Sequence, residues 1–313
     1  MPVGIVWDER YLAHSAPGHP ERPERLSAIR AALVGAGLWD RLRPIAPTPA
    51  AQEDLLRVHT REHLEAVRQT AGAGGLVWFD ADTYAGPDSY DAALLAAGGV
   101  CAAVDAVAKG DVRAAFCAVR PPGHHASAGR AMGFCLLNNV AVAARHAQTA
   151  CDLKRILIVD FDVHHGNGTQ DIFYADGSVF YISTHQWPHY PGTGAAAETG
   201  AGAGAGRNLN LPLPAGSGDS EVLAALDKGL AKAEAFKPDL VLVSAGFDGH
   251  RDDPLAGFAL TEDGYAEITR HIRRLAEKSA RGRIVSVLEG GYDLGALGRS
   301  VVAHVRAMAE PGD

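Results

Sequence analysis

The sequence is poor in cysteine. Its four cysteines stand far apart, with no C-x-x-C pair among them, and are Cys101, Cys117, Cys135 and Cys151. This spacing fits neither a disulfide framework nor a thiolate zinc site. We therefore expect small apolar side chains in a reducing compartment and a cytoplasmic protein.

The sequence also lacks a surplus of basic residues. Lysine and arginine number 29 against 37 aspartates and glutamates, and the formal charge is −8. Binding to nucleic acid or to anionic lipid needs a basic surface. The composition therefore argues against both as partners, although a cationic substrate remains compatible with it. No oligomeric state is predicted.

Long hydrophobic runs are absent as well. The first residues, MPVGIVWDER, have neither a cationic start nor an apolar core, so no secretory signal is predicted. The most apolar helical stretch runs from Ala92 to Val104, consists mostly of alanine and glycine, and is followed by Asp105. We expect it to be too short and too weakly apolar to span a bilayer.

Short runs rich in valine and isoleucine alternate with longer helical patterns. Strands are predicted at 3–7, 114–119, 155–161, 179–183, 240–244 and 284–288. Helices are predicted at 20–35, 52–70, 89–109, 132–150, 220–236, 262–279 and 294–308. This alternation predicts an α/β fold with a mostly parallel central sheet and helices on both faces. No linker divides the chain, so we expect a single domain over residues 1–313, with an irregular insertion at 185–217.

The insertion contains the low-complexity piece TGAGAGAGR, residues 199–207. Gly200, Gly202 and Ala205 formally match a dinucleotide-binding glycine pattern. No predicted strand precedes the match, and NLNLPLP follows it where a helix is required. We therefore predict a flexible loop and disfavour a nicotinamide-dependent dehydrogenase.

Chemically active residues follow four of the predicted strands. The strand ends lead into RPPGHHA (120–126), DFDVHHGNGT (160–169), AGFDGHRDDPL (245–255) and EGGYDL (289–294). In open parallel sheets the ligand crevice lies at the carboxyl ends of the strands. The four segments are therefore expected to meet at one site.

The second of these segments has the spacing of a metal site. Asp160, Asp162 and His164 are two residues apart, so in extended backbone they share one side. Asp162 and His164 can then bind one ion, and Asp248 from another strand end adds a third ligand. Two carboxylates and one imidazole suit catalytic zinc with one position open to water.

The neighbouring residues suit hydrolysis at such a metal. His124 and His125 follow a Pro-Pro-Gly turn and are candidates for the general base and acid. Asp160 and Asn167 are candidates to orient these imidazoles. Tyr292, after two glycines, is a candidate hydrogen-bond donor to a developing oxyanion.

A rival metal motif lies elsewhere in the chain. His59, Glu62 and His63 form H-x-x-E-H on a predicted helix, which is the inverted zincin spacing. The motif lies far from any predicted strand end, and chance placement is easy in a chain with 14 histidines. The protease interpretation is therefore disfavoured.

Taken together, the motifs resemble the histone deacetylase superfamily of the zinc-dependent arginase–deacetylase fold. The resemblance runs from HPERPERL (19–26) to LEGGYDL (288–294). Asn167 in HHGNGT stands where the first class of these enzymes has aspartate, as in the second class and its bacterial relatives. The resemblance implies a zinc-dependent amidohydrolase that removes acetyl or other acyl groups from lysine side chains of proteins or peptides.

The resemblance also implies roles for individual residues. His125 becomes the general base and acid, His124 an electrostatic partner held by Asp160, and Tyr292 the group that polarises the acyl carbonyl. The implied zinc ligands are Asp162, His164 and Asp248. The implied potassium ligands are Asp160, Asp162, His164, Ser183 and Thr184. The implied substrate-binding residues are Gly133, Phe134 and Tyr190 in the acyl tunnel and Asp82 at its rim. Tyr190 departs from the phenylalanine that the family usually has and makes the tunnel more polar.

Two alternatives differ in substrate or in turnover. Polyamine deacetylases of the superfamily commonly place an acidic gatekeeper seven residues after the third zinc ligand, where this chain has Leu255. Leu255 favours acyl-lysine, while Asp252 and Asp253 nearby keep a small acylated polyamine as an alternative. A third possibility is a zinc-bound acyl-lysine binding protein without turnover. Intact His124, His125 and Tyr292 argue against it.

Overall fold

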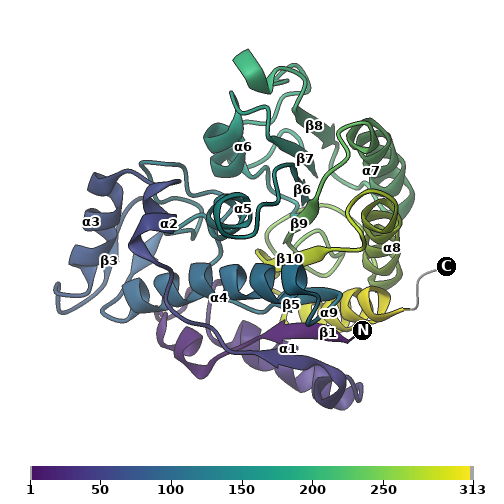
Figure 1. The fold of residues 1–313 in the computed structure, drawn as a ribbon. Helices are drawn as coiled ribbons and strands as arrows, with labels where there is room; N and C mark the ends of the chain where they lie inside the picture. The colour runs from purple at the N-terminus through teal and green to yellow at the C-terminus, as the bar shows by residue number, and fades with distance from the viewer. Residues whose placement is uncertain (1, 311–313) are drawn as a thin grey trace.

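The computed structural model describes residues 2–310 and has an eight-stranded parallel sheet at its centre, in the order β2-β1-β5-β10-β9-β6-β7-β8 (Figure 1). The strands are β1 (Val3–Val6), β2 (Arg43–Ile45), β5 (Ala114–Cys117), β6 (Ile156–Asp160), β7 (Val179–Gln186), β8 (Asn208–Leu213), β9 (Leu240–Ala245) and β10 (Ile284–Leu288). All residues of β6, β9 and β10 are buried, because helices cover both faces of a parallel sheet. The predicted α/β fold is confirmed.

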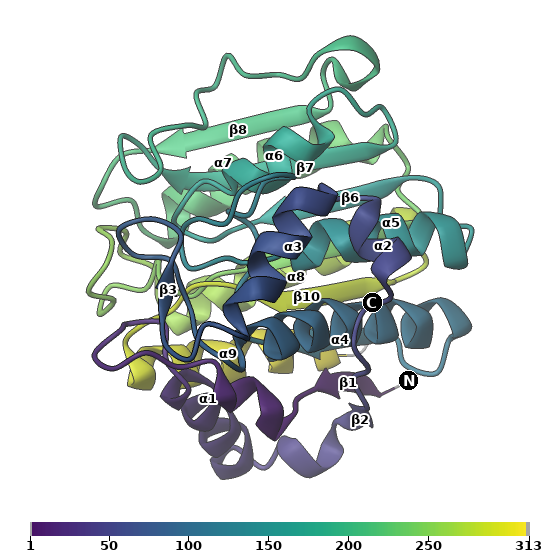
Figure 2. The same ribbon diagram turned by 90° about the vertical axis from the view of Figure 1, so that its left-hand side faces the viewer.

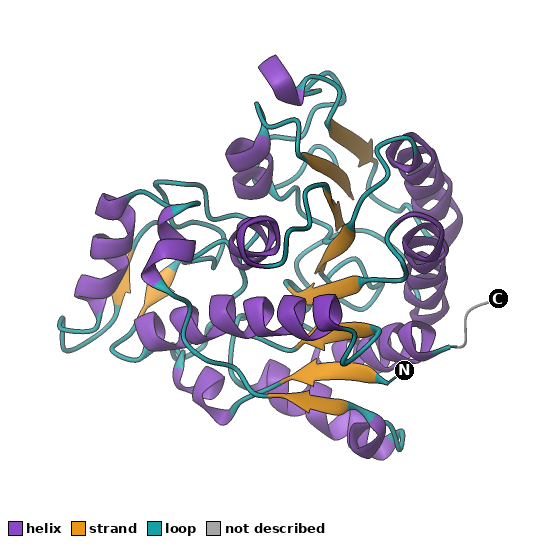
Figure 3. Cartoon of the chain, viewed as in Figure 1, coloured by secondary structure: helices purple, strands orange, loops and turns teal. Residues whose placement is uncertain are grey.

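Two groups of helices enclose the sheet (Figures 1 and 3). On one face α4 packs against α5, and on the other α1, α9, α8 and α7 pack in succession. The helices are α1 (Glu24–Gly35), α2 (Gln52–Leu56), α3 (Arg61–Thr70), α4 (Ser89–Lys109), α5 (Asn139–Ala150), α6 (Asn167–Phe173), α7 (Asp219–Glu234), α8 (Glu262–Ser279) and α9 (Leu294–Ala309). The part of the chain that the structure describes also has three short 3-10 helices: η1 (Glu9–Ala13), η2 (Trp39–Arg41) and η3 (Gly202–Gly204).

Helix α4 corrects one sequence expectation. It is 21 residues long with a mean hydropathy of 1.6 in its most apolar window, so by length and composition it could cross a membrane. The prediction that the stretch is too short and too weakly apolar was wrong. Within the fold, 67% of that window is buried. The apolar character of α4 therefore serves the protein core.

Three other expectations need correction. The helix predicted at 52–70 is broken into α2 and α3, because Thr60 caps a new helix by accepting the amide of His63 at 3.2 Å. The helix predicted at 132–150 begins only at α5, where the side chain of Asn138 caps it by accepting the amide of Ala141 at 3.0 Å. The insertion at 185–217 is not wholly irregular. It contains the end of β7 and all of β8, which adds the last strand to the sheet.

A small hairpin was also missed. Strands β3 (Val77–Trp78) and β4 (Tyr84–Ala85) pair antiparallel, and each is too short to leave a periodic pattern in the sequence. In Figure 2, β3 lies on the side of the molecule toward which the arrowhead of β8 points. The hairpin therefore stands at the carboxyl edge of the sheet.

The register of the sheet aligns the ends of the central strands. Asp160 at the end of β6 pairs with Ser183 in β7 and with Ser244 in β9, and Leu288 at the end of β10 pairs with Ala245. The segments that follow these strands thus leave the sheet side by side. This is the edge at which open parallel sheets bind ligands.

Candidate active site

Three predicted metal ligands meet beyond the ends of β6 and β9. The ligand atoms of Asp162, His164 and Asp248 all lie within 4.8 Å of one another. His164 Nδ1 is 3.1 Å from Asp162 Oδ1 and 3.1 Å from Asp248 Oδ2. The two carboxylates are almost fully buried. The arrangement leaves one imidazole nitrogen facing two carboxylate oxygens.

Backbone groups hold the two carboxylates in place. The amide of Val163 donates to Asp248 Oδ1 at 3.1 Å, and the amide of Gly290 donates to Asp162 Oδ2 at 2.8 Å. A Cβ atom on Gly290 would lie 1.9 Å from Asp248 Oδ2, and one on Gly246 would lie 2.0 Å from Asp162 Oδ2. Only glycine fits at these positions, because the backbone approaches the carboxylates so closely.

The electrostatics of this group favour a cation. Burial opposes a charge on the His164 ring, but the carboxylates of Asp162 and Asp248 outweigh it and raise the pKa of His164 to about 10. Burial also works to raise the pKa of Asp162, yet His124 and His164 together hold it below its ordinary value. The donor set of two carboxylate oxygens and one imidazole nitrogen, in its glycine cradle, matches what a catalytic zinc ion requires.

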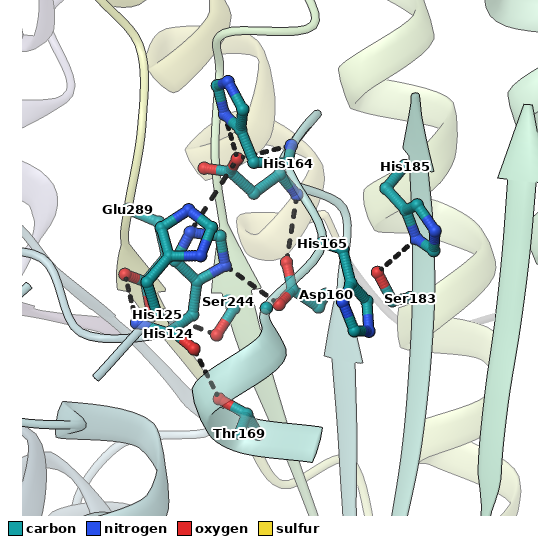
Figure 4. Close-up of polar contacts among 12 residues, drawn as sticks. His124, His125, Asp160, His164, His165, Thr169, Ser183, His185, Ser244 and Glu289 are labelled. Atoms are coloured by element: carbon teal, nitrogen blue, oxygen red, sulfur yellow. Dashed lines mark hydrogen bonds and ion pairs between the residues drawn. The ribbon is translucent and has the colours of Figure 1, made fainter. Parts of the chain in front are cut away.

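His124 is paired with a carboxylate. Its Nδ1 lies 3.1 Å from Asp160 Oδ2 (Figure 4). The hydroxyl of Tyr181 donates to the same oxygen at 3.0 Å. Burial lowers the pKa of His124, but Asp160 and Asp162 together raise it to about 10. The ring is therefore cationic at neutral pH.

His125 is paired with an amide instead. Its Nδ1 lies 2.8 Å from Oδ1 of Asn167, the first residue of α6. Its ring centroid is 4.0 Å from that of His124. Burial, followed by the charges on His124 and His164, lowers the pKa of His125 well below its ordinary value. The Nδ1–H donates to the amide oxygen, so Nε2 carries a free lone pair.

Glu289 supports the histidine pair and was missed by sequence reasoning. Its Oε2 accepts the amides of Gly123 at 2.7 Å and His124 at 3.1 Å, and its Oε1 accepts the hydroxyl of Ser244 at 3.1 Å. Burial raises the pKa of Glu289 to about 7. Glu289 is the first residue of the motif EGGYDL. Its side-chain partners lie at the ends of other strands, so no local pattern in the sequence marks its role.

The loop that carries Tyr292 is fixed from two sides. Arg25 donates to the carbonyl oxygens of Gly291 at 2.6 Å and Glu289 at 2.5 Å, and its guanidinium lies 5.0 Å from the centroid of the Tyr292 ring. Asp253 Oδ2 accepts the amide of Tyr292 at 2.7 Å. Burial, foremost among several causes, raises the pKa of Tyr292 well above its ordinary value, so the hydroxyl keeps its proton.

A cavity of about 210 Å³ opens onto the metal-ligand group. It is lined by Asp82, His125, Gly133, Phe134, His164, His189, Tyr190, Leu255 and Tyr292. The four substrate-binding residues that the resemblance implies, and Leu255 at the gatekeeper position, are all among them. Gly133 has φ +56°, and a Cβ atom there would lie 2.3 Å from Cδ2 of His125. The tunnel wall thus passes directly over the catalytic candidate.

His189 is a lining residue that sequence reasoning missed. Its Nε2 lies 3.1 Å from the carbonyl oxygen of Leu255, and its ring stacks on His164 with centroids 5.1 Å apart. Burial, followed by the charge on His164, lowers the pKa of His189. Its neighbours His164 and Leu255 follow other strands, so no local pattern in the sequence marks His189 as a lining residue.

Several predicted residues lie outside the cavity. Asp252 forms an ion pair with Arg299 at 3.2 Å, and Asp253 is buried beneath the Tyr292 loop. Ser183 and Thr184 are buried in β7, and Ser183 Oγ lies 2.9 Å from His185 Nδ1 (Figure 4). The potassium site remains a prediction.

The rival H-x-x-E-H motif is used for packing. His59 lies before α3 rather than on it, with Nδ1 3.1 Å from the carbonyl oxygen of Ser127 and Nε2 accepting the amide of Asn138 at 2.9 Å. His63 Nε2 lies 2.8 Å from the carbonyl oxygen of Leu136. These hydrogen bonds join the residues around the start of α3 to the segment before α5. Among the described residues, this motif forms no metal-ligand group.

Two further groups of possible ligands share His146. One contains Asp54 and Cys101, and the other contains Asp105 and Cys151. The carboxylates of both groups already pair with cations, Asp54 with Arg57 and Asp105 with Lys109. All four cysteines are free, and Cys151 alone among them is only half-buried.

Comparisons with known proteins agree with this geometry. The model of the histone deacetylase domain matches residues 19–308. A probable deacetylase from Archaeoglobus fulgidus is 43% identical over 99% of this chain and 87% of its own. A histone deacetylase-like amidohydrolase from Pseudomonas aeruginosa is 42% identical over 89% of this chain and 73% of its own. The crystal structure of the HDA15 HD domain superposes with a TM-score of 0.93 at 43% identity, covering 98% of this chain and 88% of that one. The chain therefore belongs to the histone deacetylase family.

Proposed function

We propose that this deacetylase is a zinc-dependent amidohydrolase that removes acyl groups from lysine side chains of proteins or peptides. One observation carries the proposal. His164 of the metal-ligand group, the neutral base candidate His125 and Tyr292 line one cavity, and Asp162 and Asp248 lie beside His164. This is the constellation that metal-assisted amide hydrolysis needs.

Zinc is the metal that fits the donor set, and Asp162, His164 and Asp248 would hold it. When bound, zinc supplies Lewis acidity for the acyl carbonyl and lowers the pKa of a water molecule. Of the three residues that would hold the ion, His164 lines the cavity, so a substrate in the cavity would lie close to the metal site. A structural potassium ion near Asp160 and Ser183 is part of the same proposal and rests on the family resemblance.

His125 carries the proton transfers. Its Nδ1–H is bound to Asn167, so Nε2 is free to accept a proton from the attacking water. The same nitrogen then protonates the amine as the C–N bond breaks. The cationic ring of His124 lies beside it and stabilises the negative charge that develops on the substrate.

Tyr292 donates a hydrogen bond to the acyl oxygen as that oxygen becomes negative. Its pKa lies well above its ordinary value, so the hydroxyl is protonated throughout the working pH range. Arg25 and Asp253 fix the backbone on either side of it. The donor is therefore in place before the reaction, which lowers the cost of reorganisation.

The cavity favours an uncharged stem over a polyamine. Leu255 lines its wall at the position of the polyamine gatekeeper. Asp252 is paired with Arg299, and Asp253 accepts backbone amides, so neither carboxylate lines the cavity. An alkyl stem fits this part of the wall, whereas a second ammonium beside Leu255 would lose its hydration without a carboxylate partner there.

The deciding experiment compares two substrates on the zinc-loaded protein. We expect kcat/KM for an acetyl-lysine peptide to exceed that for N-acetylspermidine by at least about tenfold, because Leu255 gives the second ammonium of the polyamine no carboxylate partner. A preference for N-acetylspermidine would overturn the substrate assignment. Binding of both substrates without release of acetate would favour the non-hydrolytic alternative.

A further inference from the structure

The β3–β4 hairpin presents an exposed aromatic ring beside two carboxylates. Trp78 is 51% exposed, although large apolar side chains are mostly buried in this fold. The turn carries Asp80 and Asp82. Asp80 Oδ1 accepts the amides of Asp82 at 3.1 Å and Thr83 at 2.7 Å. The hairpin stands at the carboxyl edge of the sheet (Figure 2).

A continuous series of ring contacts ties this hairpin to the catalytic cavity. Tyr292 contacts Phe134 with ring centroids 5.8 Å apart, and Phe134 contacts His19 at 4.7 Å. His19 contacts Trp78 at 6.4 Å, and its Nε2 lies 2.9 Å from the carbonyl oxygen of Asp82. The indole therefore lies two rings away from the tunnel wall, on the side where Asp82 lines the cavity.

Within residues 2–310, neither Asp80 nor Asp82 forms an ion pair with a lysine or arginine, and His19 offsets only part of the negative charge of Asp82. Burial raises the pKa of Asp82, and a hydrogen bond with Asp80 and repulsion from it raise the pKa further. A bound cation would relieve this repulsion, and carboxylates form strong hydrogen bonds with guanidinium and ammonium groups.

We propose that Trp78, Asp80 and Asp82 form a subsite at the tunnel mouth for the positively charged side chain of a residue that flanks the acylated lysine. The subsite deepens the proposed function and rests on it. An indole face attracts cations, and the paired carboxylates add charge and hydrogen-bond acceptors. Successive residues of an extended peptide are about 3.3–3.6 Å apart, so neighbouring side chains emerge beside the mouth.

Matched peptides test this subsite. Each peptide carries one acetyl-lysine and, at one of the two positions on either side, either arginine or its neutral counterpart citrulline. We expect the arginine peptide to have a kcat/KM about five- to tenfold higher at its best position, mainly through KM. The preference should shrink at high ionic strength, because salt screens exposed charges.

Variants of the hairpin assign the preference to its side chains. Trp78→Leu and Asp80→Asn should each bring the arginine-to-citrulline ratio toward one, and Trp78→Tyr should give an intermediate ratio. Asn at position 80 keeps Oδ1 for the two backbone amides and removes only the charge. Asp40→Asn is the control, because Asp40 is an exposed carboxylate on η2, just before β2 begins at the other edge of the sheet. It should leave the ratio at the wild-type value.

Three results would overturn the proposal. The first is equal kcat/KM for the arginine and citrulline peptides in the wild type. The second is an unchanged ratio in Trp78→Leu and Asp80→Asn. The third is loss of kcat/KM in these variants for N-acetylspermidine but not for the arginine peptide, which would assign the subsite to a polyamine. Failure of the proposed function itself is distinct, because then even the citrulline peptide releases no acetate.

Discussion

Nδ1 of His125 lies 2.8 Å from Oδ1 of Asn167, whereas Nδ1 of the adjacent His124 lies 3.1 Å from a carboxylate oxygen of Asp160. Two neighbouring imidazoles thus have partners of different charge. The pKa of His124 is raised to about 10, and that of His125 is lowered well below its ordinary value. Separated pKa values in adjacent groups are the usual sign of divided catalytic roles.

Changing the amide to a carboxylate should move the pH profile. A carboxylate at residue 167 favours the protonated form of His125, so Asn167→Asp should raise the pKa of His125 by about 1–3 units. The base must be neutral to act. The acid limb of kcat/KM should therefore shift to higher pH, measured with a substrate that does not titrate in the range. An unmoved acid limb would remove His125 from the role of general base.

Tyr292 should act in the transition state rather than in folding. Removal of one oxyanion donor costs about 3–4 kcal/mol, so Tyr292→Phe should lower kcat by roughly a hundred- to a thousandfold. Zinc content and Tm should barely change, because phenylalanine keeps the ring over Arg25. The carbonyl of a trifluoroacetyl substrate needs less polarisation, so kcat for this substrate should fall less in Tyr292→Phe. An unchanged kcat with acetyl-lysine, or a variant without zinc, would exclude this role.

Leu255 should control the choice between acyl-lysine and polyamine. Leu255→Glu places a carboxylate on the cavity wall, where it can pair with a distal ammonium. We expect the ratio of kcat/KM for N-acetylspermidine to that for an acetyl-lysine peptide to rise at least about tenfold. Leu255→Gln, which is similar in size and neutral, is the control and should shift the ratio far less. Equal shifts in both variants would show that charge at residue 255 does not determine the choice between the two substrates.

His304 predicts how stability depends on pH. It is fully buried between Thr269 Oγ1 at 2.6 Å and Ser286 Oγ at 2.8 Å, and burial lowers its pKa from 6.5 to about 3. As the pH falls, His304 is therefore protonated in the unfolded chain before it is protonated in the folded chain. The stabilisation is complete above about pH 6.5 and is lost as pH falls toward 3, which amounts to about 2 kcal/mol between pH 7 and 5.

Urea unfolding of wild type and His304→Gln at both pH values measures this contribution. Wild type should lose about 2 kcal/mol more free energy of unfolding between pH 7 and 5 than the variant does. The comparison uses the difference between pH values, so any loss of packing in the variant cancels. The same loss in both proteins would mean that His304 is not the buried neutral group.

The sequence predicted the site best where chemically active residues directly follow the end of a predicted strand. Apolar runs predicted the central strands, and the parallel arrangement then implied that Asp162, His164 and Asp248 would meet. Such inference works because strand ends of a parallel sheet share one edge. Contacts that depend on the packing of distant segments left no local pattern. Glu289 binding two amides of the His124 turn, and Arg25 fixing the Tyr292 loop, are of this kind.

Misplaced helix ends have a similar cause. The apolar pattern of residues 52–70 fits one helix, and the break before α3 depends on His59 reaching Ser127 and Asn138 in the segment before α5. Strand β8 was hidden by its asparagines. Asn208 and Asn210 are buried because both donate to Oε1 of Gln170 at 2.8 Å. Polar residues with buried partners do not read as a strand from sequence alone.

Zinc titration of the metal-stripped protein, followed by release of acetate from an acetyl-lysine peptide, tests the assigned metal site. We expect activity to rise with added zinc and to saturate at one equivalent per chain, because Asp162, His164 and Asp248 form one ligand group. Asp248→Ala should bind no zinc at this site and release no acetate, while His59→Ala and His63→Ala should retain both. Full activity without metal, or loss of zinc confined to the His59 and His63 variants, would contradict the assignment.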